Sequence, residues 1–390
     1  MLSNRIGRIT PSATLEMTAK AAELRAAGVD VLNLSVGEPD FPTPDNICIA
    51  AKKAIDDGHT RYTPGGGTMD LKKAVVNKLY RDNNLNFDVS QILISCGGKH
   101  SLYNACQALF QSGDEVIIFR PYWVSFPDFV SVTGAKPVFV ETDPSKQYEP
   151  VMEDLKNKIT SRTKGIIINS PSNPTGGVWS DDAVKEVLKL SKKSGAWVFS
   201  DECYEQLTYD KPYISTATLE NNIEKVLTFQ SCSKTYAMTG WRIGYTAGNK
   251  EIIKAMGKLQ SQSTSCPNSI AQSAAVEALS GDQSEVVNMR NVFKMRRDYI
   301  VNRLNNIEGV NCDIPGGAFY VFPDFSAYIG KNNIKSANDL SLYFLEQKAL
   351  VTVAGNAFGN VNSVRFSYAA SDQNLKRAME LVEESLKELK

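Results

Sequence analysis

Residues 196–204 read Ala-Trp-Val-Phe-Ser-Asp-Glu-Cys-Tyr, an apolar run of strand length that ends in an acid. Similar short runs rich in Val, Ile and Phe occur at 115–119, 137–140, 165–169, 226–229 and 243–248. Stretches with helical spacing lie near 45–57, 68–82, 99–111 and 181–194. Strands that are apolar on both faces and separated by helices predict an α/β fold, with a mostly parallel central sheet covered by helices.

The flanking regions differ from this alternating pattern. A helix is predicted over 12–27, Gly28 ends it, and the Gly-Pro segment 37–44 follows as an ordered loop. A long helix is predicted over 282–306, then strands at 318–322 and 363–367 and helices at 337–347 and 372–389. These elements predict a large domain over 45–285. A smaller α+β domain is expected to contain 286–390 together with the N-terminal segment 1–44.

Composition and charge argue against several classes of binding partner. The chain has 390 residues, 43 Lys plus Arg against 43 Asp plus Glu, and 42% apolar residues. A net charge of zero provides no basic field for nucleic acid or an anionic membrane surface. No apolar run approaches the roughly 18 residues of a membrane span, and no secretory leader is recognisable. We therefore expect no nucleic-acid partner, no membrane association and a cytoplasmic location.

Cysteine and histidine usage excludes several kinds of catalytic site. Seven cysteines without a C-x-x-C pair fit neither a disulfide framework nor a thiolate zinc site, which agrees with a reducing cytosol. Only His59 and His100 are present, so a three-histidine metal site is excluded and no metal is expected. Neither histidine stands near a nucleophile motif such as G-x-S-x-G. Proton transfer is therefore expected to depend on Lys, Tyr, Asp or Glu.

The chemistry-bearing residues follow the predicted strands. In parallel sheets ligands bind beyond the carboxyl ends of the strands. Asp201 ends one run, although this run alone leaves a turn-capping role open. The run at 226–229 leads into Gln-Ser-Cys-Ser-Lys-Thr-Tyr at 230–236, and Arg242 follows. Two serine hydroxyls, a lysine and a guanidinium suit a phosphate, and a solvated turn is the alternative.

A second anion-binding signal is Gly97-Gly98-Lys99 before a predicted helix. Glycines let backbone N–H groups approach an anion at the helix N-terminus. The segment matches neither the dinucleotide nor the ATP-binding glycine motif. A phosphate anchor, a lysine and an acid at neighbouring strand ends point to pyridoxal phosphate, which acts as an electron sink and requires a covalently bound lysine and a partner for its ring nitrogen.

Five motifs then carry a resemblance to a known family: NSPSNPTG at 169–176, SDECY at 200–204, SCSKT at 231–235, GWRIG at 240–244 and VRFS at 364–367. In order and approximate spacing they resemble the class I and II aminotransferases, from about residue 5 to the C-terminus. GEPDF at 37–41, GGK at 97–99 and PYWVS at 121–125 are most similar to the bacterial-type aspartate aminotransferase branch. The resemblance implies a fold type I pyridoxal-phosphate-dependent transferase.

The resemblance also implies the cofactor contacts. Lys234 is similar to the lysine that binds the cofactor covalently and carries a proton, and Asp201 to the acid at the ring nitrogen. Tyr204 and Asn173 match the groups at the phenolic oxygen. The remaining positions resemble the phosphate anchor and adjoining contacts: Gly98, Lys99, Trp123, Ser231, Ser233 and Arg242, with Tyr62 reaching the phosphate of a neighbouring subunit. A homodimer with shared active sites follows from this expectation for Tyr62.

For the substrates, the resemblance implies amino acids and 2-oxo acids. Arg365 is similar to the arginine that binds the substrate α-carboxylate, and Gly37, Trp123 and Asn173 match further substrate contacts. Lys99 is similar to the lysine that binds a second carboxylate, which favours a ping-pong transfer of the amino group of aspartate to 2-oxoglutarate. Alternatives are prephenate, aromatic amino acids, alanine or kynurenine as substrates, a carbon-sulfur β-lyase, and a non-catalytic protein that retains the fold.

Overall fold

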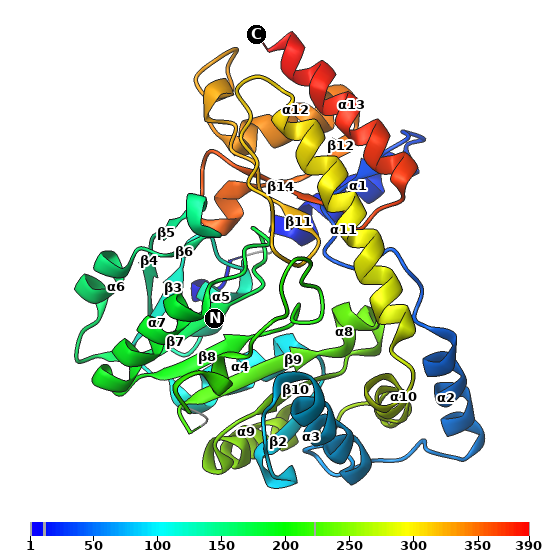
Figure 1. The fold of residues 1–390 in the computed structure, drawn as a ribbon, viewed down its shortest axis with the longest axis vertical. Helices are drawn as coiled ribbons and strands as arrows, with labels where there is room; N and C mark the ends of the chain where they lie inside the picture. The colour runs from blue at the N-terminus through cyan, green and yellow to red at the C-terminus, as the bar shows by residue number, and fades with distance from the viewer. Residues whose placement is uncertain (1, 11–12, 222–223, 390) are drawn as a thin grey trace.

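A seven-stranded sheet forms the centre of the computed structural model, which describes residues 2–10, 13–221 and 224–389 (Figure 1). Its strand order is β2-β10-β9-β8-β7-β3-β4. The strands are β2 (Ile92–Ser95), β3 (Glu115–Phe119), β4 (Lys136–Val140), β7 (Thr163–Asn169), β8 (Trp197–Asp201), β9 (Val226–Ser231) and β10 (Gly244–Ala247). Strand β10 is antiparallel to both neighbours, and the other neighbouring pairs are parallel. The mostly parallel sheet is confirmed; β2 was not predicted, because its apolar run is short.

Both faces of the sheet are covered by helices. Side chains alternate along each strand, so Ile117 and Phe119 of β3 enter one core while Val116 and Ile118 enter the other. On one face, the packed residues include residues of α2 (Asp45–Asp56), α3 (Met69–Asn83), α6 (Met152–Lys158), α7 (Asp181–Ser194) and α10 (Ser269–Ser280). On the other face, they include residues of α4 (Gly98–Leu109), α5 (Ser125–Ser131) and α9 (Lys250–Ser263). Burial on both faces explains why the strands are apolar throughout.

Helix α7 shows how the sequence fixes an element. The Ser180 side chain accepts a hydrogen bond from the Ala183 N–H at the start, and Gly195 ends the helix with a φ of 78°. Asp181 and Asp182 occupy the first turn and two lysines the last, which suits the helix dipole. The predicted range 181–194 is confirmed. Helices α9 and α10 were not predicted; α10 is rich in Ala and Ser and shows little contrast between its faces.

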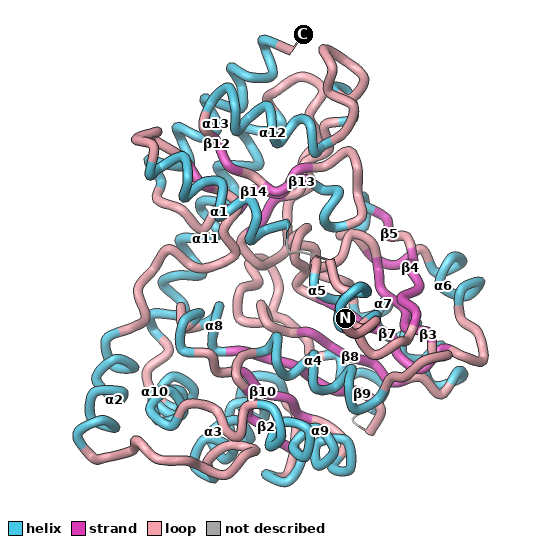
Figure 2. The backbone as a smooth tube through the Cα atoms, turned by 180° about the vertical axis from the view of Figure 1, so that it is seen from behind, coloured by secondary structure: helices cyan, strands magenta, loops and turns pink. Residues whose placement is uncertain are grey.

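A second core lies above the sheet in Figure 1 and is seen from behind in Figure 2. It contains residues of α11 (Ser284–Asn305), α12 (Ala337–Lys348) and α13 (Asp372–Glu388). A three-stranded antiparallel sheet crosses it, with the order β11 (Tyr320–Val321), β14 (Val364–Ser367) and β13 (Val353–Ala354). The predicted strands at 318–322 and 363–367 are therefore present but shorter. The proposed domain limits, 45–285 against 1–44 with 286–390, stay a prediction.

The N-terminal segment joins this second part of the molecule. Strand β1 (Leu32–Asn33) pairs in parallel with β12 (Leu350–Val351). Ala21 of α1 (Ala13–Ala26) packs with Leu345 and Val351.

The remaining short strands and α-helix are β5 (Thr142–Asp143), β6 (Glu149–Pro150) and α8 (Cys232–Thr235). In the described part of the chain, no helix is long and apolar enough to cross a membrane.

Candidate active site

Three neighbouring parallel strands end at one edge of the sheet, and a cavity of about 370 Å³ lies there. Asn169 ends β7, Asp201 ends β8 and Ser231 ends β9. Asn169 and Asp201 are register partners across the sheet. The structure brings almost all of the predicted site residues to this cavity: Gly37, Gly98, Lys99, Trp123, Asn173, Asp201, Tyr204, Ser231, Ser233, Lys234, Arg242 and Arg365. Tyr62 lies elsewhere, 91% exposed, between α2 and α3.

One end of the cavity is an anion cradle. The Ser231 hydroxyl accepts a hydrogen bond from the Ser233 N–H at 3.1 Å, and the two hydroxyls lie 2.9 Å apart. The start of α4 at Gly98 lines the same space, and the first N–H groups of a helix lack acceptors within the helix. The Arg242 guanidinium is held by the carbonyls of Thr239 and Cys96, at 2.7 and 3.3 Å. Hydroxyls, N–H groups and a guanidinium together suit a phosphate dianion.

The cradle requires glycine at position 97. Gly97 has a φ of +91°, and a Cβ there would lie 2.4 Å from the Arg242 Nη2. Arg242 itself has a left-handed backbone, with a φ of 58°. A non-glycine residue in that conformation persists only where its surroundings impose it, and such positions gather at functional sites. Gly97 therefore provides room for the guanidinium beside the helix start.

Lys234 lies in the short helix α8, directly after β9. Its Nζ donates a hydrogen bond to the Gly37 carbonyl at 2.5 Å, so the loop after β1 closes over it. Removal from water lowers the pKa of Lys234 below its usual value, because burial disfavours the charged ammonium. A lysine with a lowered pKa is a better nucleophile and proton acceptor at neutral pH.

Asp201 is buried at the end of β8 and lines the cavity. Burial raises its pKa to about 7, the Cys203 N–H lowers it through a hydrogen bond of 3.2 Å, and Glu202 raises it. The Asn169 amide donates to the Asp201 backbone carbonyl at 3.3 Å and holds the two strand ends together. A carboxyl group with a pKa near neutrality can supply a proton to a ligand and remain beside it as an anion.

Arg365 enters the cavity from β14 in the other part of the molecule. Its guanidinium donates to Asn173 Oδ1 at 2.9 Å and to the Ser35 carbonyl at 2.6 Å. Its Nε is buried and has no hydrogen-bond partner within the described residues. The guanidinium lies over the Tyr320 ring, 4.6 Å from its centroid. A buried cation with a free donor is suited to bind a carboxylate.

Lys99 and Trp123 also line the cavity, and the ammonium of Lys99 lies 5.0 Å from the centre of the Trp123 ring. Burial lowers the pKa of Lys99, and the charge of Arg242 lowers it further. Trp123 comes just before α5 and packs edge-to-face on Phe126. The cavity thus has cationic groups at several points of its wall, which suits a ligand with more than one anionic group.

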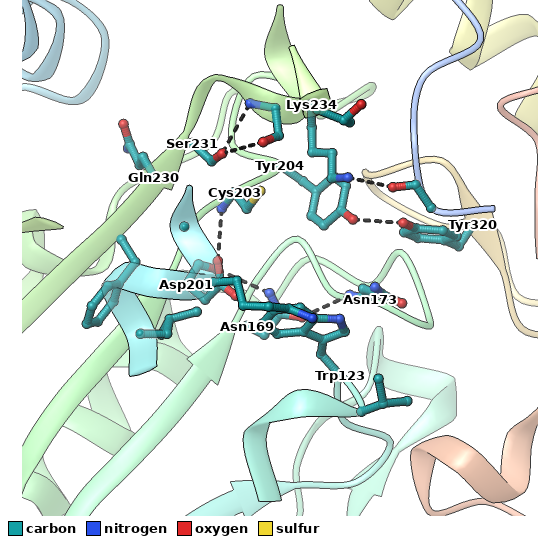
Figure 3. Close-up of a pocket in the computed structure, with 18 of the residues that line it drawn as sticks. Trp123, Asn169, Asn173, Asp201, Cys203, Tyr204, Gln230, Ser231, Lys234 and Tyr320 are labelled. Atoms are coloured by element: carbon teal, nitrogen blue, oxygen red, sulfur yellow. Dashed lines mark hydrogen bonds between the residues drawn. The ribbon is translucent and has the colours of Figure 1, made fainter. Parts of the chain in front are cut away.

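Several lining residues were not predicted: Leu102, Val124, Asn169, Cys203, Phe229, Gln230, Thr239 and Tyr320. Figure 3 shows Tyr320 beside Tyr204, with a hydroxyl-to-hydroxyl distance of 2.8 Å. The sequence gives no local motif around Tyr320. Its place at the site depends on β11, a strand of the second core. Asn169 was within a quoted motif, and its position at a predicted strand end was the signal that could have identified it.

Comparison with known proteins identifies the family. The family model described as aminotransferase class I and II matches residues 29–382. An aspartate/prephenate aminotransferase of Cereibacter sphaeroides is 46% identical over 97% of this chain and 96% of its own length. An aspartate aminotransferase of Geobacillus stearothermophilus is 44% identical over 98% of each chain.

Solved structures give the same result for the fold. The aspartate aminotransferase of Rhizobium meliloti superposes with a TM-score of 0.96 at 40% identity, and the match covers 100% of both chains. The aspartate aminotransferase of Thermus thermophilus with maleate has a TM-score of 0.94 at 38% identity, over 99% of each chain. By its sequence, its fold and the residues gathered at its strand ends, the chain belongs to the class I and II aminotransferase family.

Proposed function

We propose that the protein is a pyridoxal-phosphate-dependent aminotransferase that moves the amino group of aspartate to 2-oxoglutarate, giving oxaloacetate and glutamate by a ping-pong mechanism. The observation that carries this proposal is the placement of Lys234 and Asp201 in one cavity with the Ser231, Ser233 and Arg242 cradle. The names of the curated relatives, aspartate or aspartate/prephenate aminotransferase, support the same reaction.

The residues present fit this cofactor. The cradle offers hydroxyl, guanidinium and helix N-terminal donors for its phosphate, with the backbone N–H groups of Gly98 and Lys99 at the helix start. Asp201 offers a carboxyl group of suitable pKa to the ring nitrogen. Trp123 and Leu102 provide apolar surface in the same cavity. When bound, pyridoxal phosphate supplies an aldehyde and a ring that withdraws electrons from the substrate Cα.

Lys234 and Asp201 then have separate tasks. Lys234 Nζ would hold the aldehyde carbon of the cofactor, and its amine, once free, would carry a proton to and from the substrate Cα. Its lowered pKa makes the neutral amine available for this transfer. Asp201 would keep a proton on the ring nitrogen, and its carboxylate would pair with the resulting positive charge.

Tyr204 and Asn173 are proposed to hydrogen-bond the phenolic oxygen of the cofactor. Both line the cavity and are buried. Tyr204 is oriented by the hydroxyl of Tyr320, and the backbone of Asn173 is held by Asn169 Oδ1 at 2.9 Å. Donors whose positions are fixed before the ligand arrives lose little freedom on binding. They are therefore suited to hold the oxygen in one orientation.

Arg365 is proposed to bind the α-carboxylate of the substrate. Its guanidinium contacts Asn173 and lies over the Tyr320 ring, and its buried Nε has no hydrogen-bond partner among the described residues. Gly37, through its backbone, and Trp123, through its indole N–H, are proposed as further substrate contacts because they line the same cavity as Arg365. Fixing the α-carboxylate orients the bond to be broken relative to the cofactor ring. The large and small domains proposed above then both contact the substrate.

Aspartate specificity depends on a cation for the second carboxylate, and Lys99 is the residue we assign. The Thermus thermophilus relative was solved with maleate, a dicarboxylate, which supports a site for two carboxylates. Prephenate is a second candidate substrate, since the Cereibacter sphaeroides relative carries both names. Initial rates with aspartate, glutamate, alanine, tyrosine, kynurenine and prephenate test this assignment, and pyruvate release from cystathionine without a 2-oxo acid would instead identify a β-lyase.

Lys99→Ala is expected to raise the KM for aspartate by about tenfold to a hundredfold, the size of one lost charge-assisted contact. The KM for alanine should change little, because alanine has no second carboxylate. Steady-state kinetics of both donors with a fixed acceptor measure the difference. Lys258→Ala, at a lysine of α9 outside the cavity lining, is the matched control. Equal changes in both KM values would contradict the role of Lys99.

A cytoplasmic homodimer with shared active sites is part of the proposal. Tyr62 is 91% exposed in the single chain, which is unusual for so large a ring. We propose that a second copy covers it and that its hydroxyl reaches the phosphate in the partner's cavity. The seven cysteines are all free, which supports a reducing compartment.

Tyr62→Phe is expected to weaken cofactor binding by about tenfold, because one hydrogen bond to a charged phosphate is lost. Titration of the cofactor-free protein with pyridoxal phosphate measures this loss of affinity. The matched control is Tyr80→Phe, because Tyr80 is a tyrosine of α3 that is 66% exposed. A hybrid dimer of a Tyr62→Phe chain with a Lys234→Ala chain decides the sharing. Its Lys234-bearing site should bind normally if the tyrosine comes from the partner, and weakly if it comes from the same chain.

A further inference from the structure

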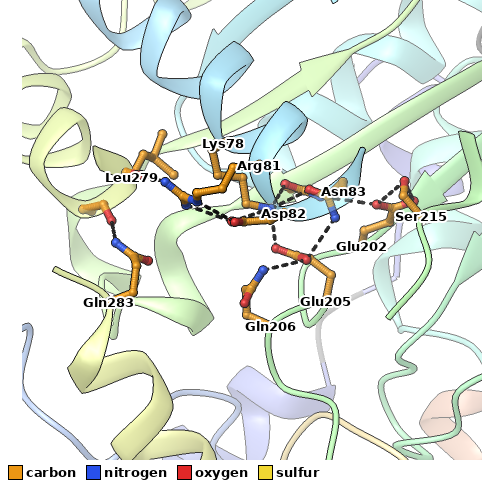
Figure 4. A network of polar contacts seen from close by, with 12 residues as sticks. Lys78, Arg81, Asp82, Asn83, Glu202, Glu205, Gln206, Ser215, Leu279 and Gln283 are labelled. Carbon is orange, nitrogen blue, oxygen red and sulfur yellow. Dashed lines mark hydrogen bonds and ion pairs between the residues drawn. The ribbon is translucent and has the colours of Figure 1, made fainter. Parts of the chain in front are cut away.

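A buried ion network, drawn in Figure 4, adjoins the proposed cofactor site through Gln230, which lines the cavity. Its centre is Lys78 of α3, which is only 2% exposed. The Lys78 ammonium donates to Asn83 Oδ1 and to Gln230 Oε1, each at 2.8 Å, and to the Glu205 carboxylate. The three protons of the ammonium are therefore all used inside the protein. The mechanism proposed above gives this lysine no task.

Two of the three partners of Lys78 come from the segments at the ends of β8 and β9, and the third, Asn83, is the last residue of α3. Gln230 is the residue before Ser231 on β9 and itself lines the cavity. Glu205 follows Tyr204, and Asn83 Nδ2 donates to its second oxygen at 3.1 Å. Gln230 Nε2 also lies 3.3 Å from Glu202 Oε2, and Glu202 follows Asp201. Through these contacts Lys78 connects α3 to the segment 201–205 and to the end of β9.

Glu202 carries a second buried carboxyl group into the network. It is fully buried and accepts hydrogen bonds from the hydroxyls of Ser200 and Ser215 and from the Thr216 N–H, at 2.8–3.1 Å. Burial raises the pKa of Glu202 to about 7. Lys78 contacts the buried acid Glu205 directly and is connected to the buried acid Glu202 through Gln230, and a buried charge is costly to leave uncompensated.

The electrostatic effect of Lys78 reaches Cys232, which lies beside the cavity. Burial raises the pKa of the Cys232 thiol to about 12, and the charge of Lys78 opposes that rise. Cys232 lies between the cradle residues Ser231 and Ser233. On the other strand, Glu202 raises the pKa of Asp201. The titratable and charged groups that face the network are Asp82, Arg81, Tyr213, Tyr236 and Tyr245, with Asp201 and Lys234 on the side of the cavity.

We propose that Lys78 is a positioning residue for the active site: acting through Glu205, Gln230 and Glu202, it fixes the two strand ends that present Asp201 and Lys234 and offsets the negative charge of the acids beneath them. This proposal rests on the cofactor assignment made above. A buried ion pair can often be replaced by apolar residues without loss of stability, so stability alone is no reason for this one. Its position between the two strand ends gives it a task that an apolar replacement would not perform.

The test is a pH titration of the absorbance of the protein loaded with pyridoxal phosphate. Lys78→Met removes the cation, leaves the acids uncompensated and favours protonated states in the cavity. The midpoint of the absorbance titration should therefore move to higher pH by about one unit. This is the size of shift expected when a charge is removed one layer of side chains away. Glu205→Gln leaves the cation in excess and should move the midpoint to lower pH. The double variant Lys78→Met/Glu205→Gln should return it to the wild-type value.

Lys73→Met is the matched control, because Lys73 is an exposed lysine of the same helix. Thermal unfolding of each variant distinguishes a purely structural role of Lys78 from an effect on the active site. If Lys78→Met lowers the melting temperature but leaves the midpoint unchanged, the proposal is overturned. Should Lys78→Met not fold, Glu205→Gln still tests the shift to lower pH, and the double variant still tests the return to the wild-type midpoint. A wild-type protein that binds no pyridoxal phosphate overturns the cofactor assignment as well, whereas a coloured protein with unmoved midpoints overturns only the role of Lys78.

Discussion

Lys234→Ala is expected to lower the turnover number with aspartate and 2-oxoglutarate by at least about a thousandfold. The variant loses both the nucleophile that holds the aldehyde and the base that moves the Cα proton, and removal of a general base alone costs on the order of 10²–10⁴ in rate. The side chain lies at the end of β9 with its Nζ on the Gly37 carbonyl, and no other described lysine lining the cavity is on this strand end. Stopped-flow measurement of each half-reaction gives the loss directly.

The covalent link provides an independent check on Lys234. Borohydride reduction of the loaded wild-type protein, followed by peptide mass mapping, should place the adduct on Lys234 and not on Lys99, the other lysine in the cavity lining. Lys99→Ala should keep the adduct, and Lys234→Ala should lose it. An adduct found elsewhere, or turnover retained by Lys234→Ala, would overturn the proposed function.

Asp201→Asn is expected to lower the rate of the aspartate half-reaction by about a hundredfold to a thousandfold, the cost of removing one well-placed electrostatic group. Asparagine has nearly the same shape, but it cannot hold a proton on the ring nitrogen as a paired carboxylate does. The Cys203 N–H and the Asn169 amide should still hold the strand end, so the fold should be retained. Single-turnover kinetics at pH 8, above the pKa of about 7, compare the variant with the ionised wild type.

A modified cofactor distinguishes two causes of lost activity in Asp201→Asn: the lost charge on the ring nitrogen and a misplaced cofactor. Pyridoxal phosphate methylated on the ring nitrogen carries a fixed positive charge there and needs no acid to keep it. We expect it to restore part of the lost rate in Asp201→Asn and to leave the Lys234→Ala variant inactive. If it restores nothing while thermal stability is unchanged, the assignment of Asp201 to the ring nitrogen is wrong.

Local sequence signals predicted many of the elements. The strand at 115–119 and the helix at 181–194 were placed at their observed bounds, because apolar runs and capping residues act over a few positions. Strand β2 was missed because three apolar residues, Ile92, Leu93 and Ile94, are too few to distinguish a strand from a turn. Its place at the sheet edge depends on pairing with β10, more than 140 positions later.

The sequence by itself determined the α/β pattern, the resemblance to the family and most of the residues at the strand ends, because parallel strands bring the positions that follow them to one edge. Only the tertiary structure decided that Arg365 and Tyr320 reach this edge from a second core, and that Lys78 lies buried behind it. Such contacts join residues far apart in the chain, and their energies depend on burial and on mutual distance, which no local pattern contains.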